Sequence, residues 1–297
     1  MLNILTQPFV LLAAAAGLIL AGIHAYLGFH VVSRGVIFVD LSLAQAAAFG
    51  AVISLLIGVP PHTAGEYFVS LSFTLLGALI ISLSRTRDDR VPHEAFIGII
   101  YAGFSALAII FLSGQPEGMH ELEHMLAGSL LTCTPRELMI IAMLYSGIGL
   151  FHFIFRKKFF LISENRQLAI SSGTNVVLWD FLFYASFGMV VTSSVHIAGV
   201  LLVFSLLVVP PVCALLISKS KGWRLAIGWA LALPAALVGL LFSVSFDLPT
   251  GPAIIASLIA ILLLVGFVSR FTRSVSVSEK WQAKSVSEAA LRPESES

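Results

Sequence analysis

Charged residues are scarce in this sequence. Only 11% of its 297 residues are Asp, Glu, Lys or Arg, whereas 58% are apolar. A water-soluble domain does not need that much apolar surface, so this class of protein is excluded. Apolar runs of about 20 residues, the length with which an α-helix crosses about 30 Å of hydrocarbon, recur along the chain. We therefore expect an all-α, polytopic integral membrane protein.

Three further features are missing. Cys133 and Cys213 are the only cysteines, and they are too few and too far apart for a disulfide framework. No basic patch with interleaved aromatic residues occurs, which argues against nucleic-acid binding. The sequence also lacks the Gly-x-x-x-x-Gly-Lys-Ser/Thr phosphate loop. A P-loop nucleotide-binding site is therefore not expected in this chain.

The apolar runs indicate eight or nine transmembrane helices. The first run has no positive charge before it and leads directly into further spans, so we expect it to stay as a membrane helix rather than be cleaved as a signal peptide. The spans are expected at about residues 8–30, 37–58, 64–83, 94–113, 136–155, 177–195, 197–218, 224–245 and 252–269.

The positions of Lys and Arg predict the orientation, because positively charged loops stay in the cytoplasm during insertion. With the N-terminus outside, Arg136 is the only one of the 17 basic residues that falls on the outer side. The same arrangement places the C-terminus in the cytoplasm.

The predicted domain organisation is simple. Residues 1–270 form one transmembrane domain, which contains an outer loop at about 114–135 and an inner segment at about 160–176. In the inner segment, Ser163 is expected to cap a short helix that Gly173 ends. The tail, 271–297, is rich in Ser and Glu and is expected to be a disordered cytoplasmic extension.

Proline interrupts two of the apolar stretches near the C-terminus. The run from Gly199 reaches Pro210-Pro211, where we expect the helical pattern to end, and Asp247-Leu-Pro-Thr-Gly-Pro252 breaks the chain before the last span. In lipid, a freed backbone group must find a partner in protein or in a water-lined cavity, so such breaks suit a translocation pathway. Ordinary helix kinks and a tight turn are the alternative.

These stretches also carry a family resemblance. Gly199 to Ala214 and Asp247 to Ile254, together with Glu94-Ala-Phe-Ile-Gly98 and Leu126-Ala-Gly-Ser-Leu-Leu131, resemble the permeases of the metal-uptake branch of ATP-binding cassette (ABC) importers. Their order and spacing match as well, over about residues 30–269. The resemblance implies the ABC importer permease architecture in a prokaryotic inner membrane.

The resemblance also implies a function. The permease would be a homodimer with a pathway at its centre, lined in part by Pro210 and Asp247. Its partners would be cytoplasmic ATP-binding cassette subunits, an extracytoplasmic metal-binding protein and membrane lipid. A divalent zinc, manganese or iron ion would be the cargo, with no permanently bound cofactor and no enzymatic activity of the chain itself.

The inner segment is similar to the coupling helix of that family. The family pattern is Asp-Pro-Glu-x-Ala-x-x-x-Gly, and Ala169 and Gly173 match it, whereas Gln167 stands in place of the Glu. A short polar helix of this kind can sit in a cleft of the ATPase and pass its closure to the spans as a rigid-body movement. A merely solvated basic loop is the alternative.

The second span departs from the family pattern, which often has an Asp and, four residues later, a His facing the pathway. Alignment on Gly50 puts Gln45 at the His position and Leu41 at the Asp position, with Asp40 next to it. A Gln amide is a weaker ligand than imidazole for zinc or manganese. Asp40 remains a candidate metal ligand, because an ionisable group in a membrane span is by default functional.

The outer loop offers replacements for the missing imidazole. His120 and His124 are four residues apart and would share one helix face, where Glu121 or Glu123 could help them to hold a divalent ion. A solvated His-rich loop is the alternative for this segment.

Other functions are also compatible with the sequence. His120-Glu121-x-x-His124 is also the zinc-protease signature, although no facing motif supplies a third ligand. An ion-coupled secondary metal carrier would not need the coupling segment. A permease for a metal chelate would need a wider pathway.

Overall fold

The computed structural model describes residues 7–60, 63–85, 91–113 and 130–290. Within these residues it is helical without strands, and nine helices are long and apolar enough to cross a membrane. The prediction of an all-α polytopic membrane protein is therefore confirmed. The elements are α2 (Pro8–Arg34), α3 (Val39–Leu56), α4 (Ala64–Leu83), α5 (His93–Leu112), the 3-10 turn η1 (Leu130–Thr132), α7 (Pro135–Ile154), α8 (Arg156–Glu164), α9 (Arg166–Ser171), α10 (Val176–Ala198), α11 (Val200–Ile217), α12 (Lys221–Phe246) and α13 (Thr250–Ala290).

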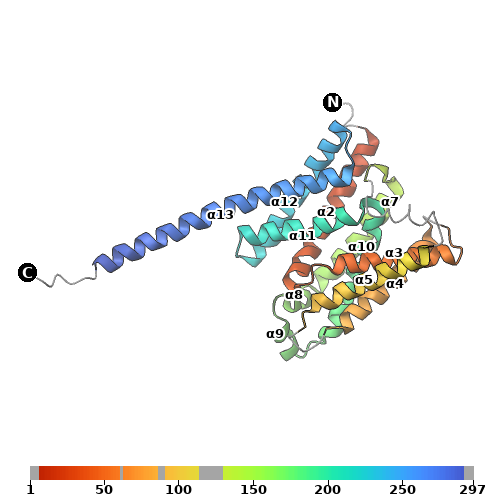
Figure 1. The fold of residues 1–297 in the computed structure, drawn as a ribbon, viewed down its shortest axis with the longest axis horizontal. Helices are drawn as coiled ribbons and strands as arrows, with labels where there is room; N and C mark the ends of the chain where they lie inside the picture. Colours follow the sequence, from red (N-terminus) through yellow and green to blue (C-terminus); the bar gives the residue numbers. More distant parts are fainter. Residues whose placement is uncertain (1–6, 61–62, 86–90, 114–129, 291–297) are drawn as a thin grey trace, which may run out of the picture.

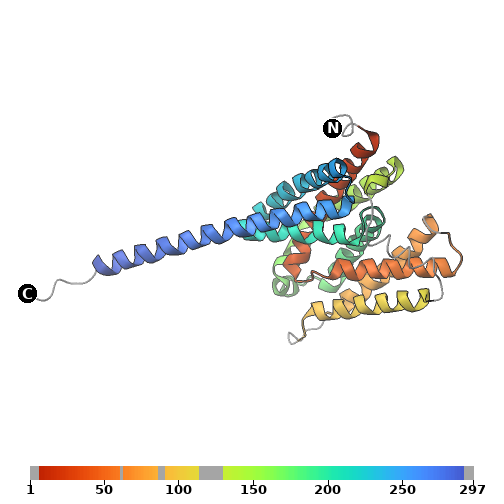
Figure 2. The same cartoon turned by 45° about the horizontal axis from the view of Figure 1, so that its top comes forward.

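The spanning helices fall into two groups that α10 joins. In one group α3 packs against α4 and α5, and in the other α2 packs against α11 and α12 while α13 covers α11 and α12. α10 contacts α3 and α4 on one side and α11 on the other. Figures 1 and 2 show the first group in orange and yellow, and α2 in red, α11 in turquoise and α12 and α13 in blue.

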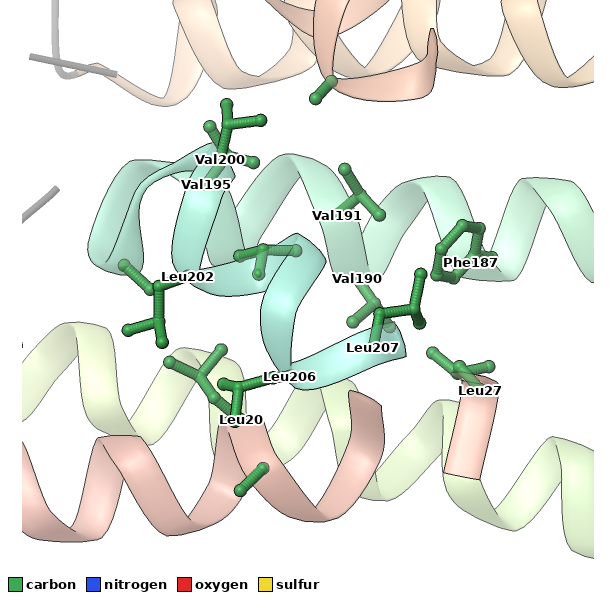
Figure 3. Packing of buried hydrophobic residues seen from close by; sticks show 14 of the residues in the cluster. Leu20, Leu27, Phe187, Val190, Val191, Val195, Val200, Leu202, Leu206 and Leu207 are labelled. Atoms are coloured by element: carbon green, nitrogen blue, oxygen red, sulfur yellow. The ribbon is translucent and has the colours of Figure 1, made fainter. Parts of the chain in front are cut away.

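The apolar core lies where the two groups meet. Figure 3 shows α11 between α2 and α10, with side chains of all three in contact. α3 is the most enclosed of the spans, with 72% of its apolar window buried, whereas only 17% of the corresponding window of α5 is buried. The exposed faces of α5, α7 and α13 carry large apolar side chains, as expected of helices that face lipid.

The helix α11 corrects one expectation. Pro210 and Pro211 do not end it, because the helix continues to Ile217 with both prolines inside. Each proline removes one backbone N–H donor and so frees a carbonyl four residues earlier, which a membrane helix tolerates where neighbouring helices pack closely. The break lies instead at Gly199, the single residue between α10 and α11, whose φ of 77° favours glycine.

The C-terminal helix runs beyond the membrane-crossing length. The apolar span ends at Arg270, and the ribbon of α13 continues to Ala290, away from the other helices (Figure 1). An isolated helix that packs against nothing has little stability of its own. The boundary at residue 270 and the disorder expected for 271–297 stay predictions.

Candidate functional site

The inner segment contains two short helices, α8 and α9, that lie beside the ends of α2 and α10. Asn165 separates them with an extended backbone (φ −148°, ψ 85°), and its side-chain oxygen accepts a hydrogen bond from the Leu168 N–H at 3.0 Å. Asn165 is therefore the cap of α9, and the assignment of that cap to Ser163 is wrong. Gly173, with φ of 74°, follows the last turn of α9, as expected.

Exposed apolar side chains distinguish α9 from an ordinary solvated loop. Ala169 is buried against Ile162 and Val176 and holds the helix in place. Leu168 and Ile170 are 53% and 51% exposed, although α9 is too short and too polar to cross a membrane. Gln167 and Gly173 are exposed as well. The segment thus presents a surface suited to contact with another protein.

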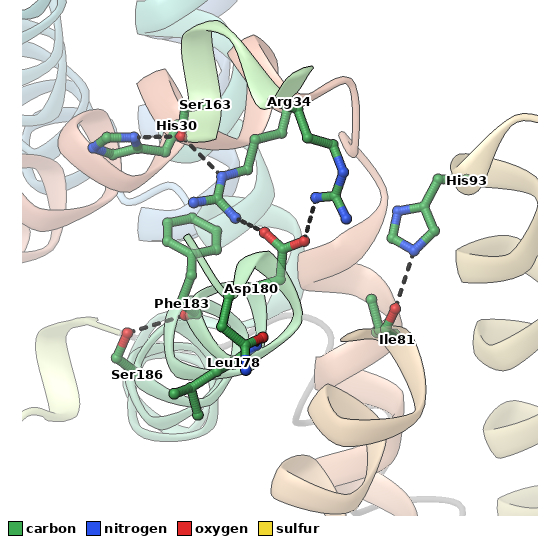
Figure 4. Close-up of polar contacts among 11 residues, drawn as sticks. His30, Arg34, Ile81, His93, Ser163, Leu178, Asp180, Phe183 and Ser186 are labelled. Atoms are coloured by element: carbon green, nitrogen blue, oxygen red, sulfur yellow. Dashed lines mark hydrogen bonds and ion pairs between the residues drawn. The ribbon is translucent and has the colours of Figure 1, made fainter. Parts of the chain in front are cut away.

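A buried ion-pair network joins α9 to the spans. Arg34, at the end of α2, donates from Nη1 to Oδ1 of Asp180 on α10 at 2.8 Å (Figure 4). Arg166, the first residue of α9, donates to the other oxygen, Oδ2. The Arg34 and Asp180 side chains are 1% and 0% exposed, whereas that of Arg166 is 24% exposed. One buried carboxylate therefore binds two guanidinium groups from different elements.

Ser163 belongs to the same network. Its hydroxyl accepts a hydrogen bond from Arg34 Nε at 2.8 Å and lies 2.9 Å from Nδ1 of His30 (Figure 4). The Arg34 guanidinium also lies over the Phe183 ring, 4.0 Å from its centroid. These contacts fix the Arg34 side chain between α2, α8 and α10.

A second set of polar contacts continues along α7 and α10. His152 Nε2 lies 2.8 Å from the Ser186 hydroxyl, and His152 Nδ1 lies 3.3 Å from the hydroxyl of Tyr26 on α2. Further along, the Tyr145 hydroxyl lies 2.6 Å from that of Ser194. Such buried hydrogen bonds fix the relative positions of packed helices.

Asp40 lies in the first turn of α3 and is 1% exposed. Its Oδ1 has no hydrogen-bond partner. The free N–H groups of the first turn favour a negative charge there, and Glu94 of α5 accepts a hydrogen bond from the Phe38 N–H just before it at 3.3 Å. Gln45, little more than one turn further on, is half-buried. An orphaned carboxylate oxygen on an enclosed span is a candidate ligand for a passing cation.

The two other expected pathway residues occupy different environments. Pro210 is buried inside the protomer, and Asp247 is exposed in the turn between α12 and α13. Asp247 has a φ of 53° and ends α12, and the turn is closed by the Ser243 hydroxyl, which donates to the Leu248 carbonyl at 2.6 Å.

The expected outer metal site lies outside the described residues. His120, Glu121, Glu123 and His124 fall within 114–129 and are not placed. Among the residues that are placed, no three His, Cys, Asp or Glu side chains are close enough to hold a metal ion.

The network around Asp180 was not found from the sequence. Neither Arg34 nor Asp180 is among the residues that the sequence indicates as a functional site. The sequence does contain one signal for this network, which is the acidic Asp180 inside the sixth apolar run. Charges within membrane spans are rare and almost always paired or functional. Its partners lie 146 and 14 positions away in the sequence, so only the fold identifies them.

Comparisons with known proteins agree with this architecture. Residues 6–269 match the model of the ABC 3 transport family. The manganese transport system membrane protein MntC of Halalkalibacterium halodurans is 23% identical over 291 residues, which cover 96% of this chain and 95% of that protein. The chelated iron transport system membrane protein YfeD of Yersinia pestis is 24% identical over 248 residues, covering 84% and 81%.

The fold is shared with a solved structure. The complex PsaBC from Streptococcus pneumoniae with Fab contains a chain that superposes with a TM-score of 0.77 at 21% identity, covering 93% of this chain and 98% of that one. The family match spans most of the sequence and reaches from before the first to within one residue of the end of the last membrane span found among the described residues. The chain therefore belongs to the ABC 3 transport family, as a multi-pass membrane permease subunit of an ABC transporter and not an enzyme.

Proposed function

We propose that two copies of this chain form the translocation pathway of an ATP-driven importer for a divalent transition metal, zinc, manganese or iron. The observation that carries the proposal is the exposed surface of α9 with Leu168 and Ile170, next to the basic helix α8. We assign the end of the bundle that carries α9 to the cytoplasmic side of the membrane, together with the C-terminus. A separate ATP-binding cassette subunit binds α9, with Gln167, Ala169 and Gly173 in the coupling segment.

Alternating access is the mechanism that this arrangement supports. ATP binding closes the two ATPase subunits, α9 moves with them, and the spans open the pathway toward one side of the membrane or the other. We prefer an ATP-driven importer to an ion-coupled carrier or a metalloprotease, because the family is one of ABC permeases. The His-Glu-x-x-His sequence then serves cargo binding rather than hydrolysis.

Cargo passes, in this proposal, along the inner faces of two copies. Asp40 and Gln45 supply oxygen ligands, which accept Mn²⁺, Fe²⁺ and Zn²⁺ alike, and the second copy supplies the remainder. The Oδ1 of Asp40 that has no hydrogen-bond partner and the half-buried position of Gln45 support this role. An extracytoplasmic metal-binding protein delivers the ion to the outer loop, where His120 and His124 with Glu121 and Glu123 receive it.

The first experiment is uptake into proteoliposomes that contain this chain and its ATPase subunit. We expect ATP-dependent accumulation of manganese, zinc or Fe²⁺, and a lower uptake rate at limiting metal for the double variant His120→Ala, His124→Ala. The single variant His62→Ala, in another predicted outer loop, is the matched control. If no ion accumulates with ATP in the wild type, the importer proposal fails.

Docking of the ATPase is tested separately at α9. The double variant Leu168→Ala, Ile170→Ala removes two exposed apolar side chains, which we expect to weaken ATPase binding about 100-fold, equivalent to about 3 kcal/mol of lost burial. Lys157→Ala, on the neighbouring helix α8, is the control. Copurification of the ATPase with the double variant at wild-type affinity would place the docking surface elsewhere.

A further inference from the structure

We propose that Asp180 is the mechanical link between α9 and the transmembrane helices, and that Arg166 is the positioning residue that ties α9 to it. The inference rests on the proposed function, in which α9 receives the movement of an ATPase. It adds the path by which that movement enters the membrane domain. The path runs from Arg166 to the buried carboxylate and from there to α10 and α2.

The backbone alone does not connect α9 rigidly to the spans. Asn165 interrupts the helical hydrogen bonding between α8 and α9, and Gly173 begins the turn that leads from α9 to α10. Both junctions can therefore change angle. The apolar contacts of Ala169 with Ile162 and Val176 seat the helix, but they are not directional.

The ion pairs are directional. Asp180 uses one oxygen for each arginine, so its carboxylate cannot follow Arg166 without also acting on Arg34. Arg34 is in turn held by the Ser163 hydroxyl and by the face of the Phe183 ring (Figure 4). Charge-assisted hydrogen bonds in a dry interior are strong and sensitive to geometry. A displacement of α9 is thus passed to two spanning helices together.

The charges indicate which member of the network can be changed without unfolding the chain. Loss of Asp180 would leave two cations, one of them fully buried, without their shared anion, which is strongly destabilising. Loss of Arg166 leaves Asp180 paired with Arg34, so the buried charge stays compensated. Arg166 is also partly exposed, so its removal does not open a cavity in the core.

The test uses the complete transporter in proteoliposomes and measures manganese ions taken up per ATP hydrolysed. For Arg166→Ala we expect ATPase binding and ATP hydrolysis close to wild type, and about tenfold fewer ions moved per ATP. Arg166→Lys keeps a positive charge but not the planar guanidinium, and we expect partial recovery of that ratio. Arg156→Ala, an exposed basic residue on α8, is the matched control.

The outcomes separate this inference from the function on which it rests. An unchanged number of ions per ATP in Arg166→Ala, with the ATPase bound, would overturn the link. Loss of ATPase binding in both Arg166 variants would also overturn it, because Arg166 would then be a docking residue. Absence of ATP-driven uptake in the wild type would instead contradict the importer proposal itself.

Discussion

The backbone carbonyl oxygen of Leu207 in α11 lies only 1.9 Å from the point at which a Cβ on Gly28 of α2 would stand. The residue four positions after Leu207 is Pro211, which has no N–H to bind that carbonyl. The freed oxygen therefore faces the neighbouring helix, and the absence of a side chain at Gly28 lets the two backbones approach. Close approach through glycine is a common way to pack membrane helices.

Replacement of Gly28 by alanine should therefore destabilise the contact between α2 and α11. The methyl group would meet backbone, which cannot move aside as a side chain can, and we expect a loss of about 1–3 kcal/mol. Thermal unfolding of the purified permease in detergent would measure it. Gly22→Ala is the control on the same helix, since nothing lies within 4 Å of its added Cβ. Equal melting temperatures for the two variants would contradict the packing described.

Much of this fold follows from the sequence because the bilayer sets the length of each span. The predicted span 64–83 coincides with α4, and α5 and α7 differ from their predictions by one residue at each end. The sequence-based predictions fail where a residue interacts with a partner that is distant in the sequence. Ser163 resembles a cap by residue type, yet its hydroxyl bonds to Arg34, 129 positions away. Passage of a helix through the double proline depends on Gly28 across from it, a contact that the sequence does not reveal.

Asp40→Asn should abolish most metal uptake while the protein remains folded. The amide has nearly the same shape as the carboxylate but no negative charge, so it holds a divalent ion far less well. Uptake of manganese against external concentration would measure the loss, which we expect to reach about tenfold or more. Ser42→Ala, which removes another buried oxygen without a partner on α3, is the control. Wild-type uptake by Asp40→Asn would remove this residue from the pathway.

Gln45→His should change the preference among metals. An imidazole at this position supplies the nitrogen ligand that zinc favours, and zinc uptake should reach half its maximal rate at a lower concentration than in the wild type. Competition between zinc and manganese in the same vesicles would show the shift, with Gln45→Asn as a control that keeps an amide. An unaltered competition profile would mean that Gln45 does not face the ion.

Cys133 offers a test of the charge beside the first turn of α7. Burial raises the pKa of its thiol, and the negative charge of Glu137 raises that pKa further. Because the thiolate is the reactive form, alkylation by a small reagent should be slow at neutral pH and faster as the pH rises. Glu137→Gln removes the negative charge and should lower the pKa, so the rate profile should move to lower pH.

This alkylation measurement needs a Cys213→Ala background and a control. Glu164→Gln, on α8 and distant in sequence, should leave the profile of Cys133 unchanged. Glutamine can keep the capping box that Glu137 forms with Thr134, so the helix start should survive the substitution. Identical profiles for Glu137→Gln and the control would mean that this carboxylate does not affect the thiol.

The single-residue turn at Gly199 has a mechanical consequence. With only Gly199 between them, the end of α10 and the start of α11 form a corner that moves when α10 tilts. The 23 residues of α10 make a lever arm of about 34 Å at about 1.5 Å per residue. A tilt of about 5° at the Asp180 end would displace that corner by about 3 Å, comparable with the width of a water molecule. A small push on one face of the membrane could thereby open or close a passage at the other.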